Sequence, residues 1–170
     1  MLKTYIYIFV TVICLCFTTA TSAQQKRGAS TPEERKVAVQ MVNFLETQPF
    51  AKQAKDYRAS LLYFLAEVPD ITVKLCTSIF GESKKFKGDY DAELTGQLAY
   101  SQAKFIIENP DKAKDEAATY LAGVEGVLRT WESIRKEKPK AKFKLMDELL
   151  EKQKTGTLAD YVKTNAAKCK

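Results

Sequence analysis

The chain contains no histidine, so it lacks the most common general base and the most common metal ligand of proteins. Catalytic systems that pair Ser or Cys with His are excluded, and so are zinc sites built on imidazole. The sequence also contains no Walker-type phosphate loop and no Gly-rich dinucleotide-binding turn. We therefore expect no enzymatic activity, no cofactor and no metal; a hydrolase that works without His is the less favoured alternative.

A strong excess of charge is also missing. The 170 residues include 27 Lys+Arg and 21 Asp+Glu, for a formal net charge of +6, and the mean hydropathy is -0.28. This balance excludes a membrane protein with several spans and argues against a wholly disordered chain. The length is that of one domain, and a 45% apolar composition is enough for a sizeable core. Because the positive excess is mild, we expect no nucleic-acid partner.

The longest apolar run lies at the N-terminus and has the form of a secretory signal. A short basic start precedes an apolar stretch of about 13 residues at 5–17, fewer than the roughly 20 that span a bilayer as a helix. Thr21 and Ala23 are small enough for the pockets of signal peptidase. We expect cleavage after residue 23, a secreted or periplasmic location, and no transmembrane segment afterwards. An uncleaved anchor is the alternative.

Cleavage would leave two of the four cysteines, Cys76 and Cys169. Two cysteines in an exported protein most often form one disulfide, which here would join the penultimate residue to the middle of the chain. Closing a loop of about 94 residues contributes on the order of 4 kcal/mol in the chain-entropy model. Free thiols, or a bond from Cys169 to a partner chain, are the alternatives.

The beginning of a folded domain is marked by helix signals. Residues 24–30 are polar and without pattern, and they predict a flexible leader. Thr31, Pro32 and Glu34 then combine an N-cap, a first-turn proline and a capping box. They predict a first helix that ends before Pro49.

The rest of the chain repeats this pattern of helical spacing and helix breakers, and no segment shows convincing strand alternation. Asn109 and Pro110 predict the N-cap and first turn of a long fifth helix. After the first helix, the expected helices cover about 51–67, 71–80, 90–108, 110–136, 141–154 and 158–167. We predict an all-α fold, a single-domain bundle of about six to seven helices at 31–170.

The densest charge lies at 135–144, where six of ten residues are basic. These residues are Arg135, Lys136, Lys138, Lys140, Lys142 and Lys144. Such a segment is able to contact an anionic surface, for example lipid headgroups or a cell-wall polymer. The plainer interpretation is a solvated loop whose lysines keep the protein soluble.

Two glycines and two charges stand out in the long fifth helix. Gly123 and Gly126 each cost about 1 kcal/mol relative to Ala in a helix interior, so they predict the close approach of a neighbouring helix. Room for a ligand against the backbone is the alternative. Glu125 lies four residues before Arg129, a spacing that predicts a surface ion pair.

Three aromatic residues, Phe105, Tyr120 and Trp131, are candidates for lining an apolar pocket, although aromatic residues at helical spacing more often belong to the core. Since no catalytic constellation is visible, we expect an exported helical protein that acts by binding. Its partner would be a protein or an anionic envelope surface. A carrier that holds a small apolar molecule near these three rings is the alternative function.

Overall fold

The structure is a computed structural model that describes residues 27–80 and 90–169; the expected signal peptide lies outside them. The described residues form six α-helices, two short 3-10 helices and no strand, so the predicted all-α fold is confirmed. The elements are α2 (Pro32–Thr47), α3 (Ala54–Glu67), η1 (Thr77–Phe80), α4 (Asp91–Glu108), η2 (Pro110–Lys112), α5 (Glu116–Glu137), α6 (Lys144–Lys154) and α7 (Leu158–Ala166).

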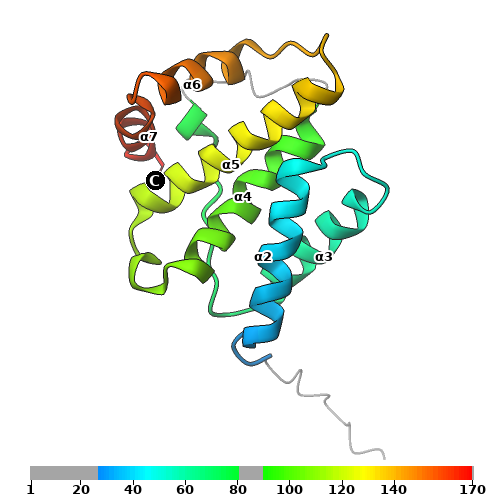
Figure 1. The fold of residues 1–170 in the computed structure, drawn as a ribbon. Helices are drawn as coiled ribbons and strands as arrows, with labels where there is room; N and C mark the ends of the chain where they lie inside the picture. The colour runs from blue at the N-terminus through cyan, green and yellow to red at the C-terminus, as the bar shows by residue number, and fades with distance from the viewer. Residues whose placement is uncertain (1–26, 81–89, 170) are drawn as a thin grey trace, which may run out of the picture.

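The helices α4 and α5 form the centre of the molecule and pack against each other (Figure 1). On one side α2 contacts both of them and α3 contacts α2, whereas α6, α7 and η1 cover the other side of α5 (Figure 1). The inner face of α5 is buried along the length of the helix, and Val124, Trp131 and Ile134 are among its fully buried residues. A helix with a buried stripe this wide requires neighbours on several sides.

Two glycines of α5 allow the close contact with α4. A Cβ atom added to Gly126 would lie 1.9 Å from Oγ and 2.3 Å from Cβ of Ser101, and one added to Gly123 would lie 3.0 Å from the backbone oxygen of Leu98. Atoms at such separations overlap. The predicted close approach of a neighbouring helix is therefore confirmed, and the neighbour is α4.

The capping box at the start of α2 is confirmed. Thr31 Oγ1 accepts a hydrogen bond from the Glu34 amide at 3.2 Å, and Glu34 Oε2 accepts one from the Thr31 amide at 2.8 Å. The hydrogen bond from the Thr31 amide stabilises the ionised carboxylate and is the main reason why the pKa of Glu34 is lowered.

Residues 27–30, which the sequence assigns to a flexible leader, are attached to the helical domain instead. The amide and the hydroxyl of Ser30 both donate to the Asp70 carboxylate at 2.8 Å, and Arg35 Nη2 donates to the same carboxylate at 2.7 Å. Arg27 forms an ion pair with Glu34. Ser30 is thus bound to a residue 40 positions further along the chain, and Arg27 is bound to α2. The domain therefore begins no later than residue 27.

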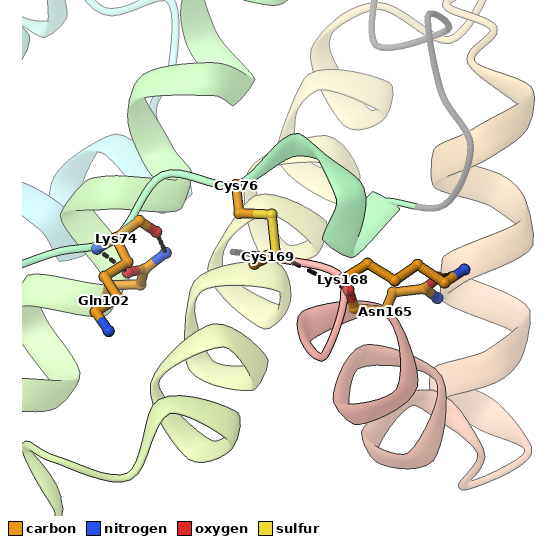
Figure 2. The surroundings of a disulfide bond; sticks show 6 residues. All are labelled: Lys74, Cys76, Gln102, Asn165, Lys168 and Cys169. Carbon is orange, nitrogen blue, oxygen red and sulfur yellow. Dashed lines mark hydrogen bonds between the residues drawn. A yellow bond between two sulfur atoms is a disulfide. The ribbon is translucent and has the colours of Figure 1, made fainter.

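The prediction of a helix at 71–80 is wrong. Only Thr77–Phe80 is helical, as a 3-10 turn, and residues 71–76 have no helical structure. The side-chain amide of Gln102 on α4 accepts from the Lys74 amide and donates to the Lys74 carbonyl, each at 3.1 Å (Figure 2). These backbone groups are thus satisfied by a side chain, which replaces the partners that a helix would provide.

The long helix also begins later than expected. Pro110–Lys112 is a separate 3-10 turn, and the side chain of Asp115 caps α5 by accepting from the Ala118 amide at 3.0 Å. Asn109 does not act as an N-cap, because its side-chain amide donates back to the Phe105 carbonyl at 3.0 Å. Asp and Asn are equally favourable as N-cap residues, so the residue types alone do not decide between Asn109 and Asp115 as the start of the helix.

The predicted disulfide between Cys76 and Cys169 is confirmed, with a Cα–Cα distance of 5.8 Å (Figure 2). It joins the segment before η1 to the residues that follow α7. The side chains of both cysteines pack against the core cluster that contains Trp131. The bond therefore fastens the C-terminal end of the domain to its interior.

The close contact of α4 and α5 predicts that Gly126→Ala lowers the free energy of unfolding by about 2 kcal/mol, because the added methyl group overpacks the contact with Ser101. Urea denaturation followed by the fluorescence of Trp131 measures this change. Gly28→Ala is the matched control, since no atom lies within 4 Å of the added Cβ. Equal stability of the two variants would contradict the close contact.

The hydrogen bonds of Asp70 predict a pH-dependent contribution to stability. Burial alone would raise the pKa of Asp70, but the bonds from Ser30 and Arg35 outweigh burial and lower this pKa from 3.8 to about 2. Because the unfolded chain takes up the proton first as the pH falls, the stabilisation is complete above about pH 4 and is lost towards pH 2.

We expect Asp70→Asn to lower the free energy of unfolding by about 1 kcal/mol at pH 6, a value reduced by solvent screening at this partly open site. The difference from the wild type should shrink between pH 4 and pH 2 in urea titrations at each pH. A difference that stays constant over this range would show that the carboxylate has an ordinary pKa in the folded protein.

Candidate functional site

The segment 135–144, here called the basic strap, spans the end of α5, a tight turn and the first residue of α6 (Figure 1). The Ala141 amide donates to the Lys138 carbonyl at 2.8 Å, which closes a turn with Pro139 inside it. Phe143 is buried, and its ring meets that of Trp131 edge-on at a centroid distance of 6.0 Å. The backbone of the strap is therefore held at both the turn and the core.

All six basic residues predicted as an anionic-surface contact are exposed in the structure: Arg135, Lys136, Lys138, Lys140, Lys142 and Lys144. Arg135 pairs with Asp147 at 3.1 Å and Lys144 with Glu148 at 3.7 Å. Among the residues that the structure describes, the other four lysines have no carboxylate within 4 Å. The strap thus presents four ammonium groups that are not neutralised by a neighbouring side chain.

Alternating burial keeps the lysines of the strap on its outer side. Ala141 is half-buried and Phe143 is buried, whereas Lys140, which precedes them, and Lys142, which lies between them, are exposed. With Tyr90, the turn borders an open hollow of about 520 Å³ on the surface. An open hollow of this kind suits an extended anionic partner better than a small molecule, which is usually enclosed by its site.

The charge of the protein is concentrated in the basic strap. The strap contains six basic residues and one acidic residue, which gives it a net charge of +5. Residues 24–170 as a whole also carry a net charge of +5, because Lys3 is the only charged residue before them. The rest of that chain is therefore balanced, and the strap makes the charge distribution one-sided.

The three aromatic residues proposed as a pocket lie in different surroundings. Trp131 is fully buried, and its Nε1 donates to the Asp147 carboxylate at 3.2 Å. Tyr120 borders a cavity beside the segment 71–76, and Phe105 borders a cleft that also contains Glu46. Trp131 borders neither of these spaces, so the three rings do not share a pocket there.

A buried ionic cluster between α2, α4 and α5 was not predicted from the sequence. Glu46 is only 5% exposed, and Arg129 donates to its carboxylate from Nε at 2.7 Å and from Nη2 at 2.9 Å. Lys104 Nζ lies 3.8 Å from the same carboxylate. The guanidinium group of Arg129 is thus held by Glu46 rather than by the expected partner Glu125, and this bond raises the pKa of Arg129.

The serine in this cluster has a structural role. Ser101 Oγ donates to Glu46 at 3.1 Å and accepts from Gln97 Nε2 at 2.9 Å. The cluster therefore connects the three helices and does not present a free hydroxyl as a nucleophile. The sequence does contain a signal for this cluster. Glu46 follows the buried Val42 by four residues, so it lies on the buried, otherwise apolar stripe of α2.

No model of a protein family, no curated protein and no solved structure matches the chain. Within residues 27–80 and 90–169, no group of three or more His, Cys, Asp or Glu residues is arranged to hold a metal ion. In the same part of the chain, no helix has both the length and the apolar character needed to cross a bilayer.

The ionic cluster predicts that Arg129→Met lowers the free energy of unfolding by about 3 kcal/mol, because the buried carboxylate of Glu46 loses its main partner. Arg135→Met is the matched control, since the pair of Arg135 with Asp147 is about half exposed on both sides. The control should lose less than about 1 kcal/mol. Urea denaturation measures both changes.

Adding Glu46→Gln to Arg129→Met should restore part of the lost stability, because it removes the uncompensated charge. A loss of similar small size in Arg129→Met and Arg135→Met would mean that water or Lys104 compensates Glu46 fully, and the cluster would then not be a major source of stability.

Proposed function

We propose that the protein is an exported binding protein that docks on anionic lipid surfaces through the basic strap. The observation that carries the proposal is a set of four exposed lysines, for which the described part of the chain provides no carboxylate partner, on a segment whose backbone is fixed. These lysines are Lys136, Lys138, Lys140 and Lys142. Docking of this kind needs no chemistry, in agreement with a sequence that offers no catalytic constellation.

Lysine suits a lipid surface because its ammonium group is a compact charge on a flexible stem and adapts to headgroups that move. Each Lys near an anionic membrane contributes about 1 kcal/mol of attraction. Four such residues therefore contribute roughly 4 kcal/mol, enough for reversible association. The attraction is long-ranged only at low ionic strength, so binding should weaken as salt is added.

The one-sided charge supports docking in a defined orientation. Because residues 24–170 outside the strap are balanced in charge, an anionic surface attracts the end of the molecule where α5 passes into α6. The turn at Pro139 and the burial of Phe143 hold the backbone there. Binding consequently orders only the lysine side chains and loses less entropy than the docking of a loose loop.

Export is the second part of the proposal. It is supported by the signal-like residues 1–23 and by the disulfide between Cys76 and Cys169, since disulfides persist mainly in oxidising compartments outside the cytosol. The partner would then be an envelope or extracellular membrane leaflet that carries anionic lipids. A carrier pocket shared by Phe105, Tyr120 and Trp131 is not part of the proposal, because Tyr120 and Phe105 border different spaces and Trp131 borders neither.

The proposal predicts that residues 24–170 co-sediment with phosphatidylglycerol vesicles and not with phosphatidylcholine vesicles at low salt. Replacing the four unpaired lysines of the strap with Gln should weaken binding by about 100-fold or more. The control replaces Lys36, Lys52, Lys55 and Lys163, which are also exposed, and has the same net charge. We expect the control to lose less than about threefold.

Equal losses in the two variants would show that net charge, and not the strap, controls binding. Absence of sedimentation with phosphatidylglycerol vesicles would overturn the lipid proposal outright. Crosslinking of the intact strap to a protein in envelope fractions, lost in the strap variant, would replace the lipid surface with a protein partner.

A further inference from the structure

A second, independent site is a cavity of about 230 Å³ at the other end of α5. It lies between the segment 71–76, the side chain of Gln102 on α4, and the first turns of α5. Its lining residues are Thr72, Lys74, Gln102, Ala113, Lys114, Glu116, Thr119 and Tyr120. The volume is below the range of sites for drug-sized ligands, so a bound molecule would have to be small.

The hydroxyl group of Tyr120 is available to a ligand in this cavity. The residue is 97% buried, but its hydroxyl, which makes no hydrogen bond within residues 27–80 and 90–169, is reached by solvent, because the described residues contain no buried side-chain N or O atom without a partner. Burial raises the pKa of Tyr120, with a further contribution from Glu116, so the hydroxyl stays protonated at neutral pH and is able to donate. A ligand acceptor in the cavity would take the place of water as the partner of this hydroxyl.

The charged groups at the cavity favour an anion. Lys74 forms an ion pair with Glu116, and the pair is more than half exposed on both sides. Lys114 also borders the cavity and has no carboxylate within 4 Å among the described residues. The three charged side chains that border the cavity therefore sum to a net charge of +1.

The wall formed by Lys74 and Gln102 is fixed in place. Figure 2 shows the amide of Gln102 paired with both backbone groups of Lys74, and the disulfide from Cys76 to Cys169 two residues further along the chain. Gln102 is fully buried, so its side chain is held in place by the residues packed around it. A cavity with a wall held in this way is preformed, and a ligand does not have to order it.

We propose that this cavity binds a small organic anion, specifically a carboxylate with a short apolar or aromatic body. The carboxylate accepts a hydrogen bond from the Tyr120 hydroxyl and pairs with the ammonium group of Lys114. The body of the ligand lies against Ala113 and the ring of Tyr120. This binding does not depend on the lipid docking of the basic strap.

The test titrates oxidised protein, residues 24–170, with sodium benzoate and follows backbone amide signals by NMR spectroscopy. Benzyl alcohol, which has the ring without the charge, is the ligand control. We expect saturable shifts at low millimolar benzoate for the amides of Thr72, Lys74, Lys114 and Thr119, and binding of benzyl alcohol that is at least about tenfold weaker.

Tyr120→Phe removes only the hydroxyl and should weaken benzoate binding by about tenfold. Lys114→Gln should weaken it by about fivefold, and Lys112→Gln is the matched control because Lys112 is exposed nearby but does not border the cavity. Reduction of the disulfide should also lower the affinity, since it releases the wall that contains Lys74.

Three results would overturn the proposal: no shifts around the cavity, equal affinities for benzoate and benzyl alcohol, or equal losses in Lys114→Gln and Lys112→Gln. The failure of this proposal is distinguishable from failure of lipid docking. Tyr120→Phe should leave binding to phosphatidylglycerol vesicles unchanged, and the strap variant should leave benzoate binding unchanged, because the two sites share no residue.

Discussion

The contact between α4 and α5 is the interaction on which the remaining structure depends. Because Gly126 has no side chain, Ser101 approaches the backbone of α5 closely enough to stand beside Glu46. Polar residues of α4 then connect its neighbours: Ser101 reaches α2 and Gln102 reaches the segment 71–76. This explains why the central helix α4 contains fully buried polar side chains, since Ser101 pairs with the buried Glu46 and Gln102 pairs with the backbone of a segment that has no helix of its own.

The two proposed sites are separated by the length of α5. This helix has 22 residues, so at about 1.5 Å per residue its ends lie roughly 33 Å apart. The basic strap follows its C-terminal end, where cations also complement the helix dipole, and the Tyr120 cavity lies at its first turns. A surface bound by the strap would therefore leave the cavity open to solvent, and both sites would be held in one rigid frame.

The sequence predicted those features that depend on neighbours in the chain. The capping box of Thr31 and Glu34, the helical periods and the reason for Gly126 are local signals, and the disulfide followed from the small number of cysteines that the expected cleavage would leave. Apart from the disulfide, features that depend on particular distant partners were missed. The segment 71–76 is not helical because Gln102 binds its backbone, and Arg129 selects Glu46, which is 83 residues away, over a neighbour four residues away. For the candidate sites, the sequence located the strap but not the Tyr120 cavity, whose walls come from three separate parts of the chain.

The non-helical residues 70–76 connect both ends of the described domain to its centre. Asp70 binds Ser30 at the N-terminal side, Lys74 is paired with Gln102 in the centre, and Cys76 is joined to Cys169 at the C-terminal side. A continuous helix over these residues would use the backbone groups of Lys74 for its own hydrogen bonds, which would leave none for Gln102. The loss of helix is thus the condition for the connection to Gln102. Because the C-terminal one is a disulfide, the domain reaches its full set of connections only where thiols are oxidised, and this dependence is the structural counterpart of the export that we propose.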